Sequence, residues 1–299
     1  MATALEAGDA GRSPGDIADA LDASLARATE KLAVRRPKND RFELYARRLR
    51  EAAAASYPGP LPWSDAGKRA QFHEALSQCP AMTRALALDD VADVRVLRAM
   101  LEKALGGPAL PLPSAVDDEA RNALFELATA ALLRAAGFRV SLEPAGTTAS
   151  ISPLPSFAVE CARVGDDWSW TEGVRRMAAR LDRRADGRTL LGLPIVGRDA
   201  LQGESRHLRG FDSLEQLERA VRATLNEGVR RAREELRRRG LAVRASCPAV
   251  LLVLSTQVLL KDRGLFGHVA QVMPFPLGDT VDPSAARVLS VLASRPFRV

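Results

Sequence analysis

Cysteine and histidine are scarce in this sequence, with three of each. The cysteines are far apart, at positions 79, 161 and 247, and the histidines are equally scattered. An odd number of distant cysteines argues against a disulfide framework and against a zinc-binding motif. This usage suits the reducing environment of the cytoplasm, where free thiols persist.

Long apolar runs are also lacking. A membrane helix needs about 20 consecutive apolar residues, and the best candidate, residues 249–260, is shorter and contains Ser255, Thr256 and Gln257. The N-terminus has no basic segment followed by an apolar one, which a secretion signal would require. We therefore expect a soluble, cytoplasmic protein without a membrane partner.

An excess of basic residues is the first positive feature. Lys and Arg number 43 against 37 Asp and Glu, which gives a net charge of +6 and a pI of about 9.7. A basic balance permits nucleic-acid binding, because cationic side chains displace the counterions of phosphate groups. GC-rich coding also produces arginine, so the charge by itself does not establish this function.

The first third of the chain is predicted to be helical. Residues 1–15 are small and polar and are expected to be disordered, and residues 16–106 are expected to form a helical N-terminal region. Apolar residues recur at helical spacing in four segments, at about 14–35, 39–56, 64–77 and 89–105. Glycine and proline are frequent in residues 107–116, which we interpret as a linker.

The remaining residues, 117–299, mix helical and strand-like patterns. In order, we expect a helix at 117–136, strands at 138–144, 148–152 and 157–164, a helix at 168–185, a strand at 190–196, a helix at 213–239, and strands at 248–256 and 268–275. A helix, a three-stranded meander and a second helix before the next strand predict an α/β fold with a mixed sheet flanked by helices.

Three short motifs lie in this second part. A predicted helix contains N-x-x-F-E-L at residues 122–127, G-x-x-V follows at 137–140, and a strand ends in E-C-A-R at 160–163. These motifs and the order of elements resemble the PD-(D/E)xK, or restriction-endonuclease-like, superfamily. More closely, they resemble bacterial proteins whose corresponding strand ends in E-C-K-R. The resemblance covers residues 115–200 best, and it implies a restriction-endonuclease-like core.

The resemblance also implies a site of which only part is present. In the family, carboxylates at adjacent strand ends hold Mg²⁺, which polarises the scissile phosphate and activates water. Here Glu126 and Glu160 match the family carboxylates and are the candidate catalytic and metal-binding residues. Ser150 stands at the aspartate position (Ala149 or Thr148 if the register is shifted), and Ala162 stands at the lysine position. Neither replacement supplies the missing charge, so efficient hydrolysis is not expected.

Other side chains offer possible replacements. Arg175 and Arg176 in the next predicted helix are candidates for the missing cation, and Glu143, Asp166 and Asp167 are candidates for the missing carboxylate. Glu160 also has a purely structural interpretation as a salt-bridge partner. A buried, unpaired carboxylate inside an apolar strand is costly. We favour a remnant of a site, because folds of this kind keep their sites at strand ends.

Arginines after the E-C-A-R strand suggest how nucleic acid would be bound. The predicted helix at 168–185 has an apolar stripe, and its basic residues lie off that stripe. The candidate phosphate contacts are Arg163, Arg175, Arg176, Arg180 and Arg183. A solvated helix face is the alternative interpretation, since arginine is common throughout the chain.

Three functional hypotheses follow. The first is a nuclease-fold protein that no longer cuts and binds nucleic acid, DNA rather than RNA, or a protein partner, with no cofactor. The second is a divergent Mg²⁺-dependent nuclease that uses Glu126 and Glu160. The third is a protein–protein scaffold in which the N-terminal helices carry the function.

Overall fold

The computed structural model of the chain has helices α1–α7 and strands β1–β7 in its described part. The N-terminal helices are α1 (Pro14–Leu32), α2 (Arg41–Ala54), α3 (Ala66–Ala85) and α4 (Val94–Leu105). The α/β part contains α5 (Glu119–Ala135), β1 (Arg139–Glu143), β2 (Gly146–Ser150), β3 (Phe157–Arg163), α6 (Trp170–Arg184), β4 (Leu191–Asp199), β5 (Arg209–Phe211), α7 (Leu214–Arg238), β6 (Ala249–Leu260) and β7 (Leu265–Pro276). The described residues are 12–38, 40–55, 61–88, 93–112, 118–143, 146–150, 156–164, 169–184, 191–199, 209–211, 213–238, 249–260, 265–276, 283, 286–287 and 290–291.

Local sequence explains where the first helix begins. The side chain of Ser13 accepts a hydrogen bond from the backbone N–H of Asp16, and the Asp16 carboxylate accepts one from the Ser13 backbone, which is a reciprocal capping box. Pro14 occupies the first helical position, where its missing N–H costs nothing. The predicted disorder of residues 1–15 is therefore wrong at its end, and residues 1–11 lie outside the described part.

Helix α3 is longer than predicted. It passes through Pro80 to Ala85, well beyond the expected end at residue 77. Proline has no N–H for the carbonyl of residue 76, and such a position costs about 3 kcal/mol or more. Burial of Cys79, Met82 and Ala85 on both sides of Pro80 offsets this cost, so tertiary packing overrides the local break.

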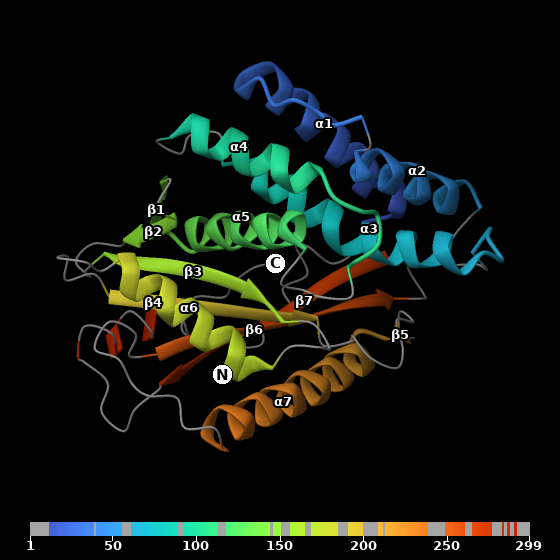
Figure 1. The fold of residues 1–299 in the computed structure, drawn as a ribbon. Helices are drawn as coiled ribbons and strands as arrows, with labels where there is room; N and C mark the ends of the chain where they lie inside the picture. Colours follow the sequence, from blue (N-terminus) through green and yellow to red (C-terminus); the bar gives the residue numbers. More distant parts are fainter. Residues whose placement is uncertain are drawn as a thin grey trace.

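The seven strands form one mixed sheet in the order β1-β2-β3-β4-β6-β5, with β7 paired to β6. Strands β1, β2 and β3 form an antiparallel meander, β4 is parallel to both β3 and β6, and β7 is antiparallel to β6. Figure 1 shows α5 on one side of the sheet and α6 and α7 on the other. This arrangement confirms the predicted α/β fold with a mixed sheet flanked by helices, and strand β5 was not predicted.

Helix α5 is the central element of the fold. Leu124 and Leu127 belong to the apolar core shared with α1–α4, whereas Leu133 belongs to the core on the sheet. A helix that is buried on two sides needs apolar residues around most of its circumference, and the sequence EARNALFELATAALLRA supplies them. Helices α3 and α4 consequently stack on α5, and α4 also contacts strand β1 (Figure 1).

The segment between α4 and α5 corresponds to the predicted linker at 107–116. Residues 113–117 of it lie outside the described part, and the division into two domains at this point stays a prediction. None of the described helices combines the length and the apolar character that a membrane crossing requires.

Candidate functional site

The site forms where strand β2 stops covering strand β3. In the antiparallel register Thr147 lies opposite Val159 and Ala149 opposite Phe157, so β2 pairs with only the first part of β3. The other edge of β3 is paired with β4 as far as Arg163. Residues 160–163, the E-C-A-R motif, therefore continue past the end of the β2 ladder.

Glu160 lies on the face of the sheet that α6 covers. Side chains alternate along a strand, so Glu160 shares its face with Ala158, which packs against Leu181 of α6. Arg184 places its Nη1 at 3.2 Å from Glu160 Oε1, and Arg180 places its Nη1 at 3.7 Å from Oε2. The glutamate side chain is only 14% exposed, so both of its oxygens face arginines in a largely enclosed setting.

Arg184 also closes the end of the β2–β3 ladder. Its guanidinium donates hydrogen bonds to the backbone carbonyls of Val159, at 3.0 Å, and Thr147, at 3.1 Å. It approaches the hydroxyl of Thr148 at 3.4 Å as well. A buried carbonyl without a partner is costly, and one arginine here satisfies two of them while pairing with Glu160.

Glu126 comes from the opposite face of the sheet. It projects from α5, and its Oε1 accepts a hydrogen bond of 2.8 Å from the Thr147 hydroxyl. Burial raises the pKa of Glu126, and the nearby charge of Glu160 raises it further. The Thr147 hydrogen bond and the charges of Arg184 and Arg180 oppose this shift of the pKa.

Cys161 lies on the same face as Glu126. Burial raises the pKa of its thiol well above the usual value, and the charge of Glu126 acts in the same direction. A thiol held in its neutral form is a poor nucleophile and a poor metal ligand. This residue is therefore a small core side chain.

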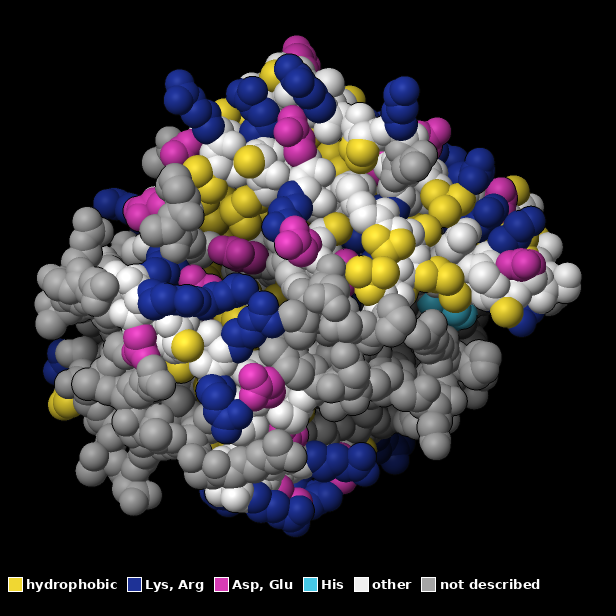
Figure 2. All heavy atoms as spheres, in the orientation of Figure 1, with side chains coloured by type: hydrophobic (Ala, Val, Ile, Leu, Met, Phe, Trp, Pro, Cys, Tyr) yellow, Lys and Arg dark blue, Asp and Glu magenta, His cyan; other side chains and the backbone are white. Residues whose placement is uncertain are grey.

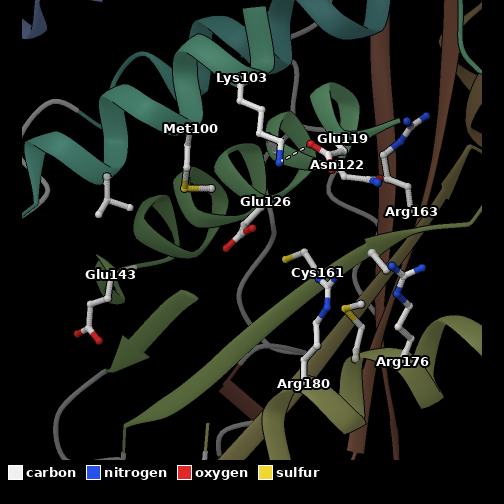
Figure 3. A pocket seen from close by; sticks show the side chains of 14 residues that line it. Met100, Lys103, Glu119, Asn122, Glu126, Glu143, Cys161, Arg163, Arg176 and Arg180 are labelled. Carbon is white, nitrogen blue, oxygen red and sulfur yellow. Dashed lines mark ion pairs between the residues drawn. The ribbon is translucent and has the colours of Figure 1, made fainter. Parts of the chain in front are cut away.

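A pocket of about 350 Å³ opens beside the unpaired edge of β3. Figure 3 shows Glu126 near its centre, with Arg163 and Arg176 at one end and Glu143 at the other. Helix α4 supplies one wall through Val96, Met100 and Lys103, α5 and β3 supply the next two, and α6 supplies the last. The N-terminal helices thus contribute directly to this site, which the sequence did not predict.

The predicted site residues divide into those that meet at this pocket and those that do not. Glu126, Glu143, Ala162, Arg163, Arg176 and Arg180 line it, and Glu160 lies next to it through its contact with Arg180. Arg175 and Arg183 are exposed elsewhere on α6, and the Arg175 Nη1 is 2.7 Å from Glu172. Asp166 and Asp167 lie outside the described residues.

Ser150 is not part of the site. It lies opposite Arg139 at the end of β2 that is remote from Glu160. The Thr147 hydroxyl instead bonds to Glu126, and the Thr148 hydroxyl lies beside Arg184, the partner of Glu160. The resemblance placed Ser150 at the position of the family aspartate. The register of β2 against β3 instead favours Thr148 for that position, which is one of the alternatives given for a shifted register. A threonine hydroxyl supplies no negative charge there either.

Arg184 and the α4 wall were missed as functional residues. The spacing of Arg176, Arg180 and Arg184 places all three on one face of a helix, and this pattern predicts a basic row toward the preceding strand. In α4, Val96, Met100 and Lys103 form a similar row beside the core positions. Only long-range packing shows that this second row faces the α/β part.

Comparison with protein-family models, with curated proteins and with solved structures finds no match to this chain. Within the described ranges no group of three or more His, Cys, Asp or Glu side chains is arranged to hold a metal ion.

Proposed function

We propose that this protein is a degenerate member of the nuclease-like α/β proteins that binds nucleic acid, with DNA as the preferred form, and does not cut it. The observation that carries the proposal is the pairing of Glu160 with Arg184 and Arg180 at the end of β3. In this arrangement, the carboxylate that would hold a metal in an active relative instead anchors a row of arginines.

The order of elements supports the kinship. Helix α5, the meander β1–β2–β3, helix α6 and strand β4 follow one another as in the core implied by the E-C-A-R motif. Glu126 and Glu160 lie on the helix and the strand where that core keeps its acids. Folds retain their architecture when their sites are lost, so the fold by itself does not supply an activity.

The side chains around the two glutamates fit a magnesium ion poorly. Mg²⁺ requires near-octahedral oxygen ligands, usually with one or two carboxylates. Glu160 faces two guanidinium groups at 3.2 and 3.7 Å, and any cation would have to displace them. Glu126 approaches from the other face, hydrogen-bonded to Thr147, and burial raises its pKa because a negative charge is costly in this position.

The α6 wall of the pocket, by contrast, suits an anion. Arg180 is 42% exposed, and its neighbours Arg176 and Arg163 line the same pocket. Arg175 and Arg183 extend the basic surface along α6. Figure 2 shows Lys and Arg side chains interspersed with acidic ones on the face between α4 and α6. Arginines arranged along one helix can contact successive phosphates of a backbone.

The test is a salt titration of DNA binding. Fluorescence anisotropy with a labelled duplex would measure affinity from low to physiological salt for the wild type, the double variant Arg175→Ala/Arg183→Ala and the control Arg219→Ala/Arg238→Ala. Both variants lose two positive charges, and the control arginines are exposed on α7 in pairs with glutamates. We expect the slope of log affinity against log salt to fall by about 0.9 for each lost phosphate contact in the α6 variant only.

Two results would contradict the proposal. One is equal weakening in the α6 and α7 variants, which would leave only an unspecific effect of net charge, and the other is no binding at low salt. A parallel incubation with Mg²⁺ or Mn²⁺ should leave DNA intact. Cleavage by the wild type that disappears in Glu160→Ala would overturn the statement that the protein does not cut.

A further inference from the structure

We propose that the pocket between α4, α5, β3 and α6 binds one nucleotide of a single strand, with its base against α4 and its phosphate on the arginines of α6. This inference rests on the proposed function, because it names the form of nucleic acid that the same site accepts. The geometry that points to it is the combination of a half-open pocket, apolar side chains on the α4 wall and a row of arginines on the α6 wall.

The volume of the pocket limits what can enter. At about 350 Å³ it is at the small end of the range for ligand pockets, which is about 300–1,000 Å³. A double helix, whose major groove alone is about 12 Å wide, is far too large for it. Duplex DNA can therefore lie along the outside of α6, but only an unpaired nucleotide can reach Glu126.

Helix α4 forms the wall of the pocket that faces Glu126. Leu97 and Leu101 hold it in the N-terminal core with no exposure to solvent, so this wall is held in place by packing. Lys103 at the same wall forms an ion pair of 2.8 Å with Glu119 of α5. Because α4 is anchored in this way, access for a duplex would require the core of the helical region to open.

The walls offer a base and a phosphate different partners. Met100 of α4 and Met177 of α6 line the pocket from two sides, and thioether sulfur makes favourable contacts with aromatic rings. Arg176 and Arg180 lie on the α6 wall, where a guanidinium can bind phosphate oxygens in a bidentate manner. Glu126 faces the space between them, where its carboxyl group can accept from, or when protonated donate to, the edge of a base (Figure 3).

A matched pair of variants on α4 tests the inference. Met100→Trp fills the pocket, whereas Val94→Trp adds the same side chain at an exposed position of the same helix outside the pocket. Anisotropy would compare a labelled single-stranded oligonucleotide with a dumbbell duplex whose ends are both closed. We expect Met100→Trp to weaken single-strand binding about tenfold or more and to leave the dumbbell unchanged, and Val94→Trp to alter neither, a tenfold change being about 1.4 kcal/mol.

A competition experiment with the wild type needs no variant and covers the case in which Met100→Trp fails to fold. Deoxyadenosine monophosphate should displace the single strand, and inorganic phosphate at the same concentration should displace it much less. Equal displacement by phosphate would overturn the inference, because the base would then contribute nothing. Displacement by the mononucleotide, with much weaker displacement by phosphate, would support the inference that a free nucleotide and a strand nucleotide share one pocket.

The outcomes separate this inference from the proposed function. If the α6 arginine variants weaken binding but Met100→Trp binds the single strand as the wild type does, the pocket inference is wrong and the proposed function stands. If no form of nucleic acid binds at low salt, both fail. If the dumbbell binds as tightly as the single strand and the mononucleotide does not compete, the arginines of α6 act alone and the pocket has no part.

Discussion

Replacing Arg121 with methionine should destabilise the protein more than any change on its surface. The Arg121 side chain is fully buried at 0% exposure, and it pairs with Asp118 at 2.9 Å and with Glu74 at 3.1 Å. Its remaining N–H groups donate to the Tyr45 hydroxyl at 2.9 Å and to the backbone carbonyls of residues 108–110. One guanidinium thus joins α2, α3, the start of α5 and the segment before it.

The cost of removing this arginine follows from what it leaves behind. The Asp118 side chain is 2% exposed and cannot become hydrated, whereas that of Glu74 is 22% exposed and can be. Breaking a buried ion pair by deleting one partner costs about 3–5 kcal/mol, because the other charge stays buried without compensation. Methionine keeps much of the apolar stem of the side chain, so we assign this loss to Asp118 and not to a cavity.

Urea unfolding followed by circular dichroism would measure the effect as a lower midpoint at unchanged slope. Arg50→Met is the control, because Arg50 is 47% exposed and also contacts two aspartates, Asp19 and Asp22, so about 0–1 kcal/mol is expected. Adding Asp118→Asn to Arg121→Met should recover part of the loss, since the amide is neutral and can still cap α5. A loss for Arg121→Met no larger than that of Arg50→Met would refute the reasoning.

Two further changes probe the site and the packing beneath it. Folding raises the pKa of Glu126, so the folded protein holds the Glu126 proton more tightly than the unfolded chain does. This proton therefore contributes to the free energy of unfolding at low pH. The contribution is lost as the pH rises from the usual glutamate pKa through the raised pKa of the folded state. Glu126→Gln should therefore be more stable than the wild type at neutral pH and lack this decline; parallel stability–pH curves from about pH 4 to 8 would contradict the assignment. At Gly197, a Cβ atom would overlap the ring of Phe125, so Gly197→Ala should cost about 1–3 kcal/mol in urea unfolding. Gly15→Ala is its control, because there the new methyl group meets Ala53 at an ordinary 3.6 Å, and equal stability of the two variants would count against the packing argument.

Most elements of secondary structure were predictable, because their causes are local. The capping aspartates Asp65 and Asp93 and the periodic apolar residues of α1, α2 and α4 mark helices within a few residues. The apolar run at residues 249–254, in the first half of β6, marks a strand. Helix α3 and strand β5 are the exceptions. Packing carries α3 through Pro80, and β5 has only three residues, too few for a pattern.

The candidate site was predictable only in its outline. The motif drew attention to Glu126 and Glu160, since an acid inside an apolar strand needs a partner, but it did not identify that partner. Arg184 became the partner because α6 packs across β3 at one angle, and Ser150 was excluded because β2 pairs in one register. Both depend on contacts between residues far apart in the chain, which local periodicity does not encode.

In helix α4, one face is determined by the local sequence and the neighbouring face by tertiary packing. Its sequence specifies a helix with one core face, and that much follows from the spacing of Leu97, Leu101 and Leu105. Nothing local distinguishes the neighbouring row that contains Met100 and Lys103 from an ordinary solvent-exposed row. That row forms a pocket wall because α5 presents apolar residues to both the N-terminal core and the sheet, and so brings α4 to the edge of β3.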